Sequence, residues 1–499
     1  MPLTEEPPSQ PSQELMLVLP RAWLQTQVLL ARSALGGATL GSADSPTVQP
    51  WLAHGHLVLQ SGWRQRLALV GPLRAGSPQP LPARSWIDPT TPANSHDGIC
   101  LLMLAPPGAT PPIGDTHWER WLHAHAPDFR LACSVPSPAV AALWLCQDGR
   151  AHAALREWGH WRTIERLQIS GSQLAQMPLP WTATASAAHG AAVPTHSDHD
   201  PAIYGADRRD SRLAAALDPT VLTRLQGCRV AVVGAGRIGS IVAHGLVRLG
   251  VARLLVMDCD AMEPHNLDGD MPPHFEGRPK VEALSRFLRP LLRPGATVDA
   301  RHLAISSPVA GSLLAQTELV IVCVDNDAAR LWANAWALAG HSNLLVITTG
   351  QQGDAASGQR LAAAELRLLP AGTGCLACLG GFAQASTLLA QLQSPLPAAT
   401  AADVRAQRPG SLRSWAGIAA NLGLRMVEQL VSGAIDRALF RRLQETPDGG
   451  LQVHDSSLNA RAPGHTCAFC TPLLGAGVAA VSPQRLQALA QQALARDNN

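Results

Sequence analysis

The second half of the chain contains four short apolar runs that end at glycine or aspartate and are separated by segments long enough to be helices. The runs are RVAVVGAG (229–236), ARLLVMDCD (252–260), TELVIVCVDN (317–326) and NLLVITTG (343–350). Nearly continuous apolar strands are typical of parallel sheets that helices cover on both faces. Strands that alternate with helices therefore predict an α/β, doubly wound fold for this part of the chain.

Changes in composition divide the chain of 499 residues. Residues 1–14 are polar and proline-rich, which predicts disorder, and the small, polar residues 182–201 are typical of a linker. We interpret 15–181 as a separate α+β accessory domain, with strand-like runs at 55–71, 99–105 and 140–146 and helix-compatible stretches at 116–126 and 153–167. The α/β domain then spans 202–475, and 476–499 form a helical tail.

The overall composition limits the kinds of partner and location that we expect for this chain. With 46% hydrophobic and 15% charged residues the chain is expected to be globular, and a formal charge of +2 favours neither nucleic acid nor a membrane as a partner. The first residues do not form a secretory signal, and no apolar run reaches 18 residues. We therefore expect a cytoplasmic protein.

The first apolar run leads into three glycines spaced as G-x-G-x-x-G, at Gly234, Gly236 and Gly239. After a strand this pattern makes a tight turn that lets phosphates approach the backbone and the start of a helix. Asp258 follows 19 residues later, where an acidic residue can bind ribose hydroxyls. At this point an NAD-dependent dehydrogenase, an ATP-using enzyme and a purely structural turn all remain open.

The residues that follow decide between them. The stretches MDCDAMEPHNLDGD (257–270), GRPKVEAL and CVDNDAARLWAN resemble the ThiF/MoeB family of adenylyltransferases, whose larger relatives are the E1 enzymes of ubiquitin-like conjugation. The resemblance covers about residues 205–470 and implies a Rossmann-like adenylation domain. The residues that match the family pattern are Asp258, Asp260, Asn266, Leu267, Lys280, Asp325, Asn326 and Arg330.

The resemblance implies a role for each matching residue. Lys280 and Arg212, the latter in RRDSR, would be cations near the phosphates of ATP, Asp325 would hold Mg²⁺, Asp258 would accept hydrogen bonds from the ribose, and Asn266 would orient the triphosphate. The residue that matches Arg212 reaches into the neighbouring subunit's site in relatives, which implies a homodimer or an internal pseudo-dimer. Taken singly, these residues could equally be a solvated lysine, a helix cap or a surface ion pair.

The sequence also departs from the family. Where the family has arginine and then glutamine, this chain has Gly269 and Asp270, so a cation is lost and an anion is added. Arg237, inside the glycine turn, could restore the charge; otherwise the enzyme is slow or is a pseudoenzyme. No cysteine lies between Leu379 and Thr466, and Val404 stands where autophagy-type relatives carry their thiol. Adenylation without a thioester from this segment is the consistent interpretation.

Four cysteines form two C-x-x-C pairs, Cys375 with Cys378 and Cys467 with Cys470. Together they can complete a closed tetrahedral zinc site, as the family does, and the alternative of four free thiols leaves the pairing unexplained. We expect structural Zn²⁺ here.

The accessory domain offers weaker signals. The stretch at 102–115 weakly resembles JAB/MPN deubiquitinase-like domains, but it lacks their ligand histidines, and His123 and His125 lie elsewhere. We interpret these two as ordinary helix residues, and the domain as a degenerate JAB-like binding or dimerisation module if it is JAB-like at all.

The sequence therefore predicts an E1-like enzyme that uses ATP and Mg²⁺ to adenylate the C-terminal carboxylate of a small ubiquitin-like or sulfur-carrier protein ending in glycine. An E2-like protein is compatible as a further partner. The alternatives are a nucleotide-binding scaffold of a conjugation system, favoured by Gly269 and the missing cysteine, and an enzyme that adenylates a peptide or tRNA. The near-neutral charge disfavours RNA.

Overall fold

The computed structural model divides the chain into two compact units, one formed mainly by residues 27–168 and the other mainly by residues 189–499. We describe each unit by itself. The structure describes residues 14–20, 51–61, 65–72, 98–105, 114, 116–120, 139–146, 150–157, 160–173, 175–178, 213, 216–266, 273–353, 360–380, 412–457, 467 and 469–497.

A nine-stranded sheet organises the first unit, in the order β7-β6-β5-β4-β2-β3-β1-β8-β9. β1 pairs parallel with β3 and β4 with β5, whereas the pairs β2–β3, β2–β4, β5–β6 and β6–β7 are antiparallel. The strands are β1 (Glu14–Pro20), β2 (Trp51–Ser61), β3 (Gln65–Pro72), β4 (Gly98–Ala105), β5 (Ala139–Cys146), β6 (Ala151–Glu157), β7 (His160–Thr163), β8 (Arg166–Ser170) and β9 (Ala175–Pro178). The three strand-like runs are confirmed as β2–β3, β4 and β5.

The helix-compatible interpretation of residues 153–167 is wrong, because this stretch belongs to β6, β7 and β8. Ala153, Leu155, Trp161 and Leu167 are buried in the sheet core. Antiparallel pairing with β5, the strand that precedes β6 in the sequence, overrides the helical propensity of Ala, Leu and Arg. In the described part of this unit, helix is found at residues 116–120. His123 and His125 lie outside the described residues.

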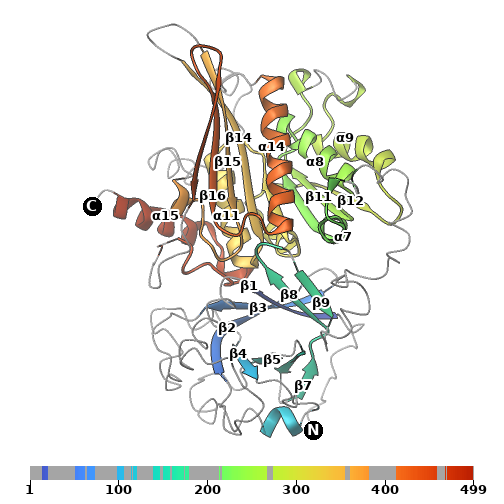
Figure 1. Cartoon of the computed structure of the whole chain (residues 1–499), viewed down its shortest axis with the longest axis vertical. Coiled ribbons are helices and arrows are strands. Elements are labelled where there is room, and N and C mark those ends of the chain that lie inside the picture. Colours follow the sequence, from blue (N-terminus) through green and yellow to red (C-terminus); the bar gives the residue numbers. More distant parts are fainter. Residues whose placement is uncertain are drawn as a thin grey trace, which may run out of the picture. The chain divides into compact units, whose positions relative to one another are not determined.

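An eight-stranded sheet organises the second unit, in the order β12-β11-β10-β13-β14-β15-β16-β17 (Figure 1). The five strands from β12 to β14 in this order are parallel, and β14 to β17 pair antiparallel. The strands are β10 (Arg229–Val233), β11 (Arg253–Asp258), β12 (Thr297–His302), β13 (Leu319–Val322), β14 (Asn343–Gly353), β15 (Arg360–Leu369), β16 (Leu439–Glu445) and β17 (Leu451–Ser457). The four apolar runs are confirmed as β10, β11, β13 and β14.

Helices cover both faces of this sheet, as the sequence predicts (Figure 1). Alternate residues of β10 enter two cores: Val230 and Val232 pack with α7, α8, α9 and α14, and Ala231 and Val233 pack with α10, α11 and α15. The helices are α7 (Pro219–Gly227), α8 (Arg237–Leu249), α9 (Lys280–Leu288), α10 (Pro308–Leu314), α11 (Asp327–Gly340), α14 (Arg413–Ser432) and α15 (Pro483–Asp497), with short 3-10 turns η3 (Pro264–Asn266), η4 (Pro273–Phe275), η5 (Arg289–Leu291), η6 (Ala377–Leu379) and η7 (Val478–Ala480). This confirms the α/β doubly wound prediction.

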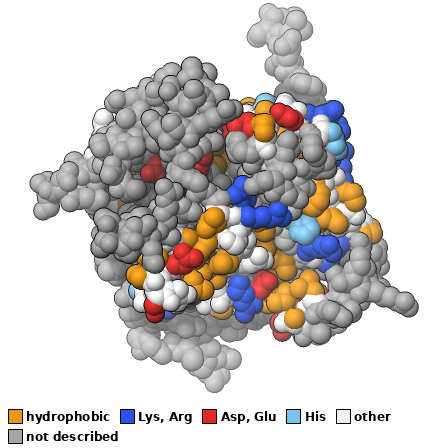
Figure 2. Space-filling model, turned by 90° about the horizontal axis from the view of Figure 1, so that it is seen from above, with side chains coloured by type: hydrophobic (Ala, Val, Ile, Leu, Met, Phe, Trp, Pro, Cys, Tyr) orange, Lys and Arg blue, Asp and Glu red, His pale blue; other side chains and the backbone are white. Residues whose placement is uncertain are grey.

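The surface carries charges of both signs. On the face shown in Figure 2, basic and acidic side chains are interspersed with apolar ones. Among the described helices, none is sufficiently long and apolar to pass through a lipid bilayer.

Candidate active site

The strand order places a switch point between β10 and β13. From β10 the chain proceeds through β11 to β12 on one side, and it then returns to β13 and β14 on the other side. In open parallel sheets the loops at such a point diverge and leave a crevice at the carboxyl ends of the strands, where ligands bind. The loops at this switch point are the glycine turn after β10 and residues 323–326 after β13.

The three glycines of the turn have different physical reasons to be glycine. Gly234 has φ +96°, and a Cβ there would lie 2.9 Å from the Cys323 carbonyl oxygen of the β13 loop. A Cβ on Gly239 would lie 1.8 Å from the Gly234 carbonyl oxygen. Gly236 is the N-cap of α8, and a Cβ there would meet nothing within 4 Å. Gly234 and Gly239 therefore shape the turn, whereas Gly236 borders open space at the helix N-terminus, where a phosphate can approach.

Asp258 ends β11 and connects the glycine turn to the next loop. Its Oδ2 accepts a hydrogen bond from the Ala235 N–H at 2.6 Å, and its Oδ1 accepts one from the Asp260 N–H at 2.8 Å. Burial raises the pKa of Asp258 above its ordinary 3.8, and the positive charge of Lys280 acts in the opposite direction. Each carboxylate oxygen keeps a second lone pair, so Asp258 can still accept hydrogen bonds from a ligand hydroxyl.

Lys280 is the first residue of α9, and it forms an ion pair with Asp260. The Lys280 Nζ lies 2.9 Å from Asp260 Oδ2, and the Lys280 side chain is 9% exposed while that of Asp260 is 50% exposed. The backbone holds the same two segments together, because the Lys280 N–H donates to the Asp260 carbonyl at 3.0 Å. The structure therefore brings Asp258, Asp260 and Lys280 together beside the glycine turn.

The residues after β13 shape the opposite side of the crevice. Asn326 caps α11, because its Oδ1 accepts a hydrogen bond from the Ala329 N–H at 2.8 Å, and Asp325 is exposed directly before it. Arg330 forms an ion pair with Asp327 at 2.6 Å and donates to the Val324 carbonyl at 3.1 Å. Asn326 and Arg330 thus hold the loop that presents Asp325.

The remaining predicted residues are placed as follows. Arg237 begins α8 directly after Gly236. Asn266 lies in η3, where its Oδ1 accepts a hydrogen bond from the Glu263 N–H at 3.1 Å. Arg212, Leu267, Gly269, Asp270 and Val404 lie outside the described residues.

Sequence reasoning missed one contact at this loop. His302, the last residue of β12, has its Nε2 2.8 Å from the Cys259 carbonyl oxygen, between the two aspartates of the loop. No motif marks this histidine, because the contact depends on the parallel pairing of β11 with β12. The other missed signal is compositional: Lys280 is the only lysine in the chain.

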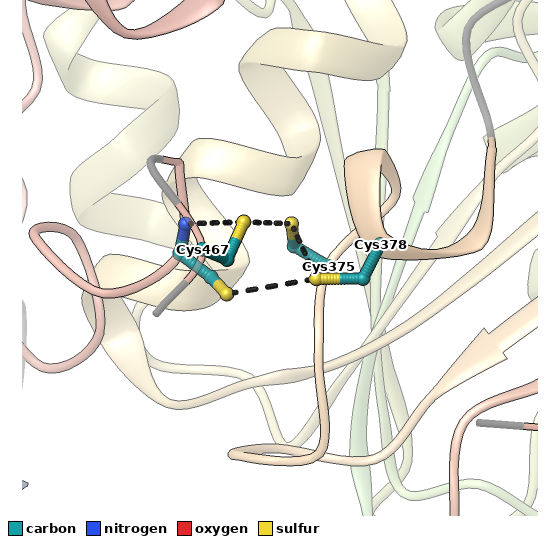
Figure 3. Close-up of side chains that lie close together, drawn as sticks. Cys375, Cys378 and Cys467 are labelled. Carbon is teal, nitrogen blue, oxygen red and sulfur yellow. Dashed lines mark hydrogen bonds between the residues drawn. The ribbon is translucent and has the colours of Figure 1, made fainter. Parts of the chain in front are cut away.

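The four paired cysteines converge, although they come from distant parts of the chain (Figure 3). The Sγ–Sγ distances are 3.6 Å for Cys375–Cys378, 3.8 Å for Cys375–Cys467 and 3.9 Å for Cys378–Cys470, and all four sulfurs lie within 4.8 Å of one another. Tetrahedral zinc with Zn–S bonds of about 2.3 Å requires sulfurs about 3.8 Å apart. The donor set and its spacing therefore fit a structural zinc ion.

The thiols of this cluster also affect one another's protonation. Hydrogen bonding, mainly from Cys375, lowers the pKa of Cys467 to about 6. Hydrogen bonds with Cys378, Cys467 and Cys470, together with burial, raise the pKa of Cys375 well above 9.0. Protonation is thus shared among neighbouring thiols, and all four would lose their protons as ligands of one zinc ion.

Comparisons with known proteins agree with this picture. The model of the ThiF family matches residues 209–463. Ubiquitin-like modifier-activating enzyme 5 of Drosophila ananassae is 31% identical over 169 residues, which cover 31% of this chain and 40% of that protein. The enzyme of the same name from Caenorhabditis elegans is 28% identical over 220 residues, which cover 39% of this chain and 50% of that protein. The chain thus spans about half or less of the length of these curated relatives.

A search of solved structures returned a looser likeness. The crystal structure of E. coli MccB with ATP has a TM-score of 0.40 and 19% identity, and the match covers 53% of this chain and 75% of that chain.

Proposed function

We propose that this chain, which belongs to the ThiF family, is an ATP-dependent adenylyltransferase. It would activate the C-terminal carboxylate of a small ubiquitin-like or sulfur-carrier protein that ends in glycine, as an acyl adenylate. The observation that carries the proposal is the meeting of Asp258, Asp260 and Lys280 beside the glycine turn, at the sheet's switch point. Similarity to ubiquitin-like modifier-activating enzymes supports the substrate class.

ATP would bind across the crevice. The open space at Gly236 and the N-terminus of α8 suit its phosphates, and the Asp258 carboxylate suits its ribose hydroxyls. The Lys280 ammonium is already held at the crevice by Asp260, so it can face the phosphates with little reorganisation.

The reaction joins the partner's carboxylate to AMP. A carboxylate oxygen attacks the α-phosphorus, the bond from that phosphorus to the bridging oxygen breaks, and pyrophosphate leaves with the electron pair. Negative charge grows on the phosphate oxygens during this step, and preorganised cations such as Lys280 stabilise it more than they stabilise the ground state.

Two metal ions belong to the proposal. Asp325, exposed at the start of α11, would hold Mg²⁺, which neutralises phosphate charge when bound. The four cysteines would hold a structural Zn²⁺ away from the chemistry. We further propose a homodimer in which Arg212 completes the partner's site. An E2-like protein would be a later acceptor of the activated small protein.

A second candidate function is a nucleotide-binding scaffold. It is favoured by Gly269 and Asp270, which stand where the family has a cationic arginine and a glutamine, and by Val404 at the family's thiol position. Arg237, which begins α8, would instead favour the enzyme if it replaces the lost cation. Both candidates bind ATP, so only turnover distinguishes them.

Pyrophosphate exchange separates them. The purified chain is mixed with ATP, labelled pyrophosphate and each small glycine-terminated protein encoded in neighbouring genes. We expect exchange with one partner, no exchange when its terminal glycine is removed, and a fall of about 10²- to 10³-fold for Lys280→Ala. Arg425→Lys, in an exposed pair with Glu428 on α14, serves as the control that keeps exchange. ATP binding without exchange for any partner would favour the scaffold, and tighter binding of NAD than of ATP would refute both.

A further inference from the structure

The basic residues of this chain are almost all arginine. Of 39 lysine and arginine residues only Lys280 is lysine, which leaves 38 arginines. Figure 2 colours both residue types blue, so nearly all the basic surface that it shows is guanidinium. The one ε-amine of the molecule therefore lies in the candidate active site.

This composition matters because an acyl adenylate is a mixed anhydride that reacts with amines. An arginine guanidinium stays protonated at every physiological pH and is a poor nucleophile, whereas a lysine amine attacks readily once it has lost its proton. A surface of arginines does not compete for the activated acyl group. Lys280 is the exception, because it lies where the adenylate would form.

The surroundings of Lys280 limit this reactivity. Its side chain is 9% exposed, and its Nζ is 2.9 Å from the carboxylate of Asp260. The backbone of Asp260 is itself held, since the Asp260 N–H donates to Asp258 Oδ1 and the Asp260 carbonyl accepts from the Lys280 N–H. Moving the amine toward an electrophile would require breaking an ion pair whose two ends are anchored by the backbone.

We propose that Asp260 is a positioning residue that holds the Lys280 amine in an ion pair, so that the one ε-amine of the chain does not attack the acyl group that the chain activates. This inference rests on the proposed function. Without Asp260, the neutral amine of Lys280 would attack the carbonyl carbon of the adenylate, an amide bond would form, the anhydride C–O bond would break, AMP would leave with the electron pair, and the amine proton would pass to solvent. The product would be a dead enzyme acylated on its phosphate-binding lysine.

Acetyl adenylate tests this without a protein partner. The full chain is incubated with the reagent, digested with trypsin and analysed by mass spectrometry, because acetylation blocks cleavage after Lys280. Arg425→Lys supplies the reference, since it introduces a lysine at a position whose side chain is 59% exposed. We expect Lys280 to react on the order of tenfold more slowly than the introduced lysine, from low exposure and the ion pair together. Asp260→Asn, which keeps shape and removes charge, should speed acetylation of Lys280 about two- to fivefold.

The outcomes are distinct. Acetylation of Lys280 in the natural chain at the rate of the introduced lysine would overturn the proposal, as would an unchanged rate in a folded Asp260→Asn variant. If that variant does not fold, the acetylation rates of Lys280 and of the introduced lysine in Arg425→Lys still test the proposal. A chain that protects Lys280 but shows no pyrophosphate exchange would refute the proposed function alone, and a chain that exchanges but acetylates itself at Lys280 would refute this inference alone.

Discussion

The Sγ atoms of Cys375 and Cys467 lie 3.8 Å apart although the residues are 92 positions apart in the sequence. Two thiols at this distance, each beside its own C-x-x-C partner, have the spacing of ligands around one tetrahedral ion. The contact also connects the segment after β15 to the segment that leads into α15. A metal ion bound here would therefore connect two parts of the second unit that are distant in the sequence.

We expect one zinc per purified chain. Cys375→Ser should lose the metal and lower the thermal unfolding temperature, because a buried thiolate ligand is removed from a closed site. Cys259→Ser, at an exposed cysteine outside the cluster, should keep the zinc content of the natural chain. Elemental analysis and thermal unfolding measure both effects. A protein without zinc and with four titratable thiols at these positions would contradict the prediction.

Two glycines of the same turn should respond differently to alanine. Gly239→Ala places a methyl group against the Gly234 carbonyl and should cost about 1–3 kcal/mol of stability through overpacking. Gly236→Ala meets open space and should cost on the order of 0.5 kcal/mol, while it weakens ATP binding by obstructing the phosphates. Urea unfolding and calorimetric ATP titration distinguish the two. Equal losses of stability in the two variants would show that the close approach of Gly239 to the Gly234 carbonyl does not shape the turn.

ATP binding should depend on the protonation of Asp258. Burial raises the pKa of this carboxyl above 3.8, so it becomes protonated at a higher pH than an exposed aspartate and then accepts ribose hydrogen bonds poorly. We expect ATP affinity to fall as pH decreases through this raised pKa. The ATP affinity of Asp258→Asn should vary with pH only through the protonation of ATP itself. Parallel plots of ATP affinity against pH for the two proteins would show that Asp258 does not bind the ribose.

The raised pKa of Asp258 affects the free energy of unfolding in the opposite direction from ATP affinity. The folded chain holds the Asp258 proton more tightly than the unfolded chain does, so this group's contribution to stability is greatest below 3.8 and falls as pH rises through the folded-state pKa. Protonation of Asp258 therefore does not drive acid unfolding.

Arg212 should act across a dimer interface. If so, neither Arg212→Ala nor Asp325→Ala alone should support pyrophosphate exchange, but a mixture should regain activity, because each mixed dimer contains one site with both residues intact. Light scattering of the natural chain should show a dimer. A monomer, or a mixture as inactive as its components, would place Arg212 in its own subunit's site or outside any site.

The local pattern of the sequence was sufficient for four strands of the eight-stranded sheet in the second unit, namely β10, β11, β13 and β14. Apolar runs such as VAVV and LLVM predict strands buried on both faces, and β10 and β11 lie where these runs predict them. The glycine spacing predicts the turn between β10 and α8, because the need for a positive φ at Gly234 and for no side chain at Gly239 is a property of the backbone itself. Such features involve residues close together in the chain.

Contacts between distant residues were decided only by the tertiary structure. Even for neighbouring segments this holds: local propensity favoured helix at 153–167, but pairing with the preceding strand β5 made part of it the strand β6, because strand pairing depends on a second segment as well as on the propensity of the first. The family pattern named Lys280 and Asp260 separately, yet only the folded chain brings Nζ to within 2.9 Å of that carboxylate. Residue types and their spacing thus determined which reactions the side chains can support. The packing of α9 against the loop after β11 decided which charged side chains form an ion pair.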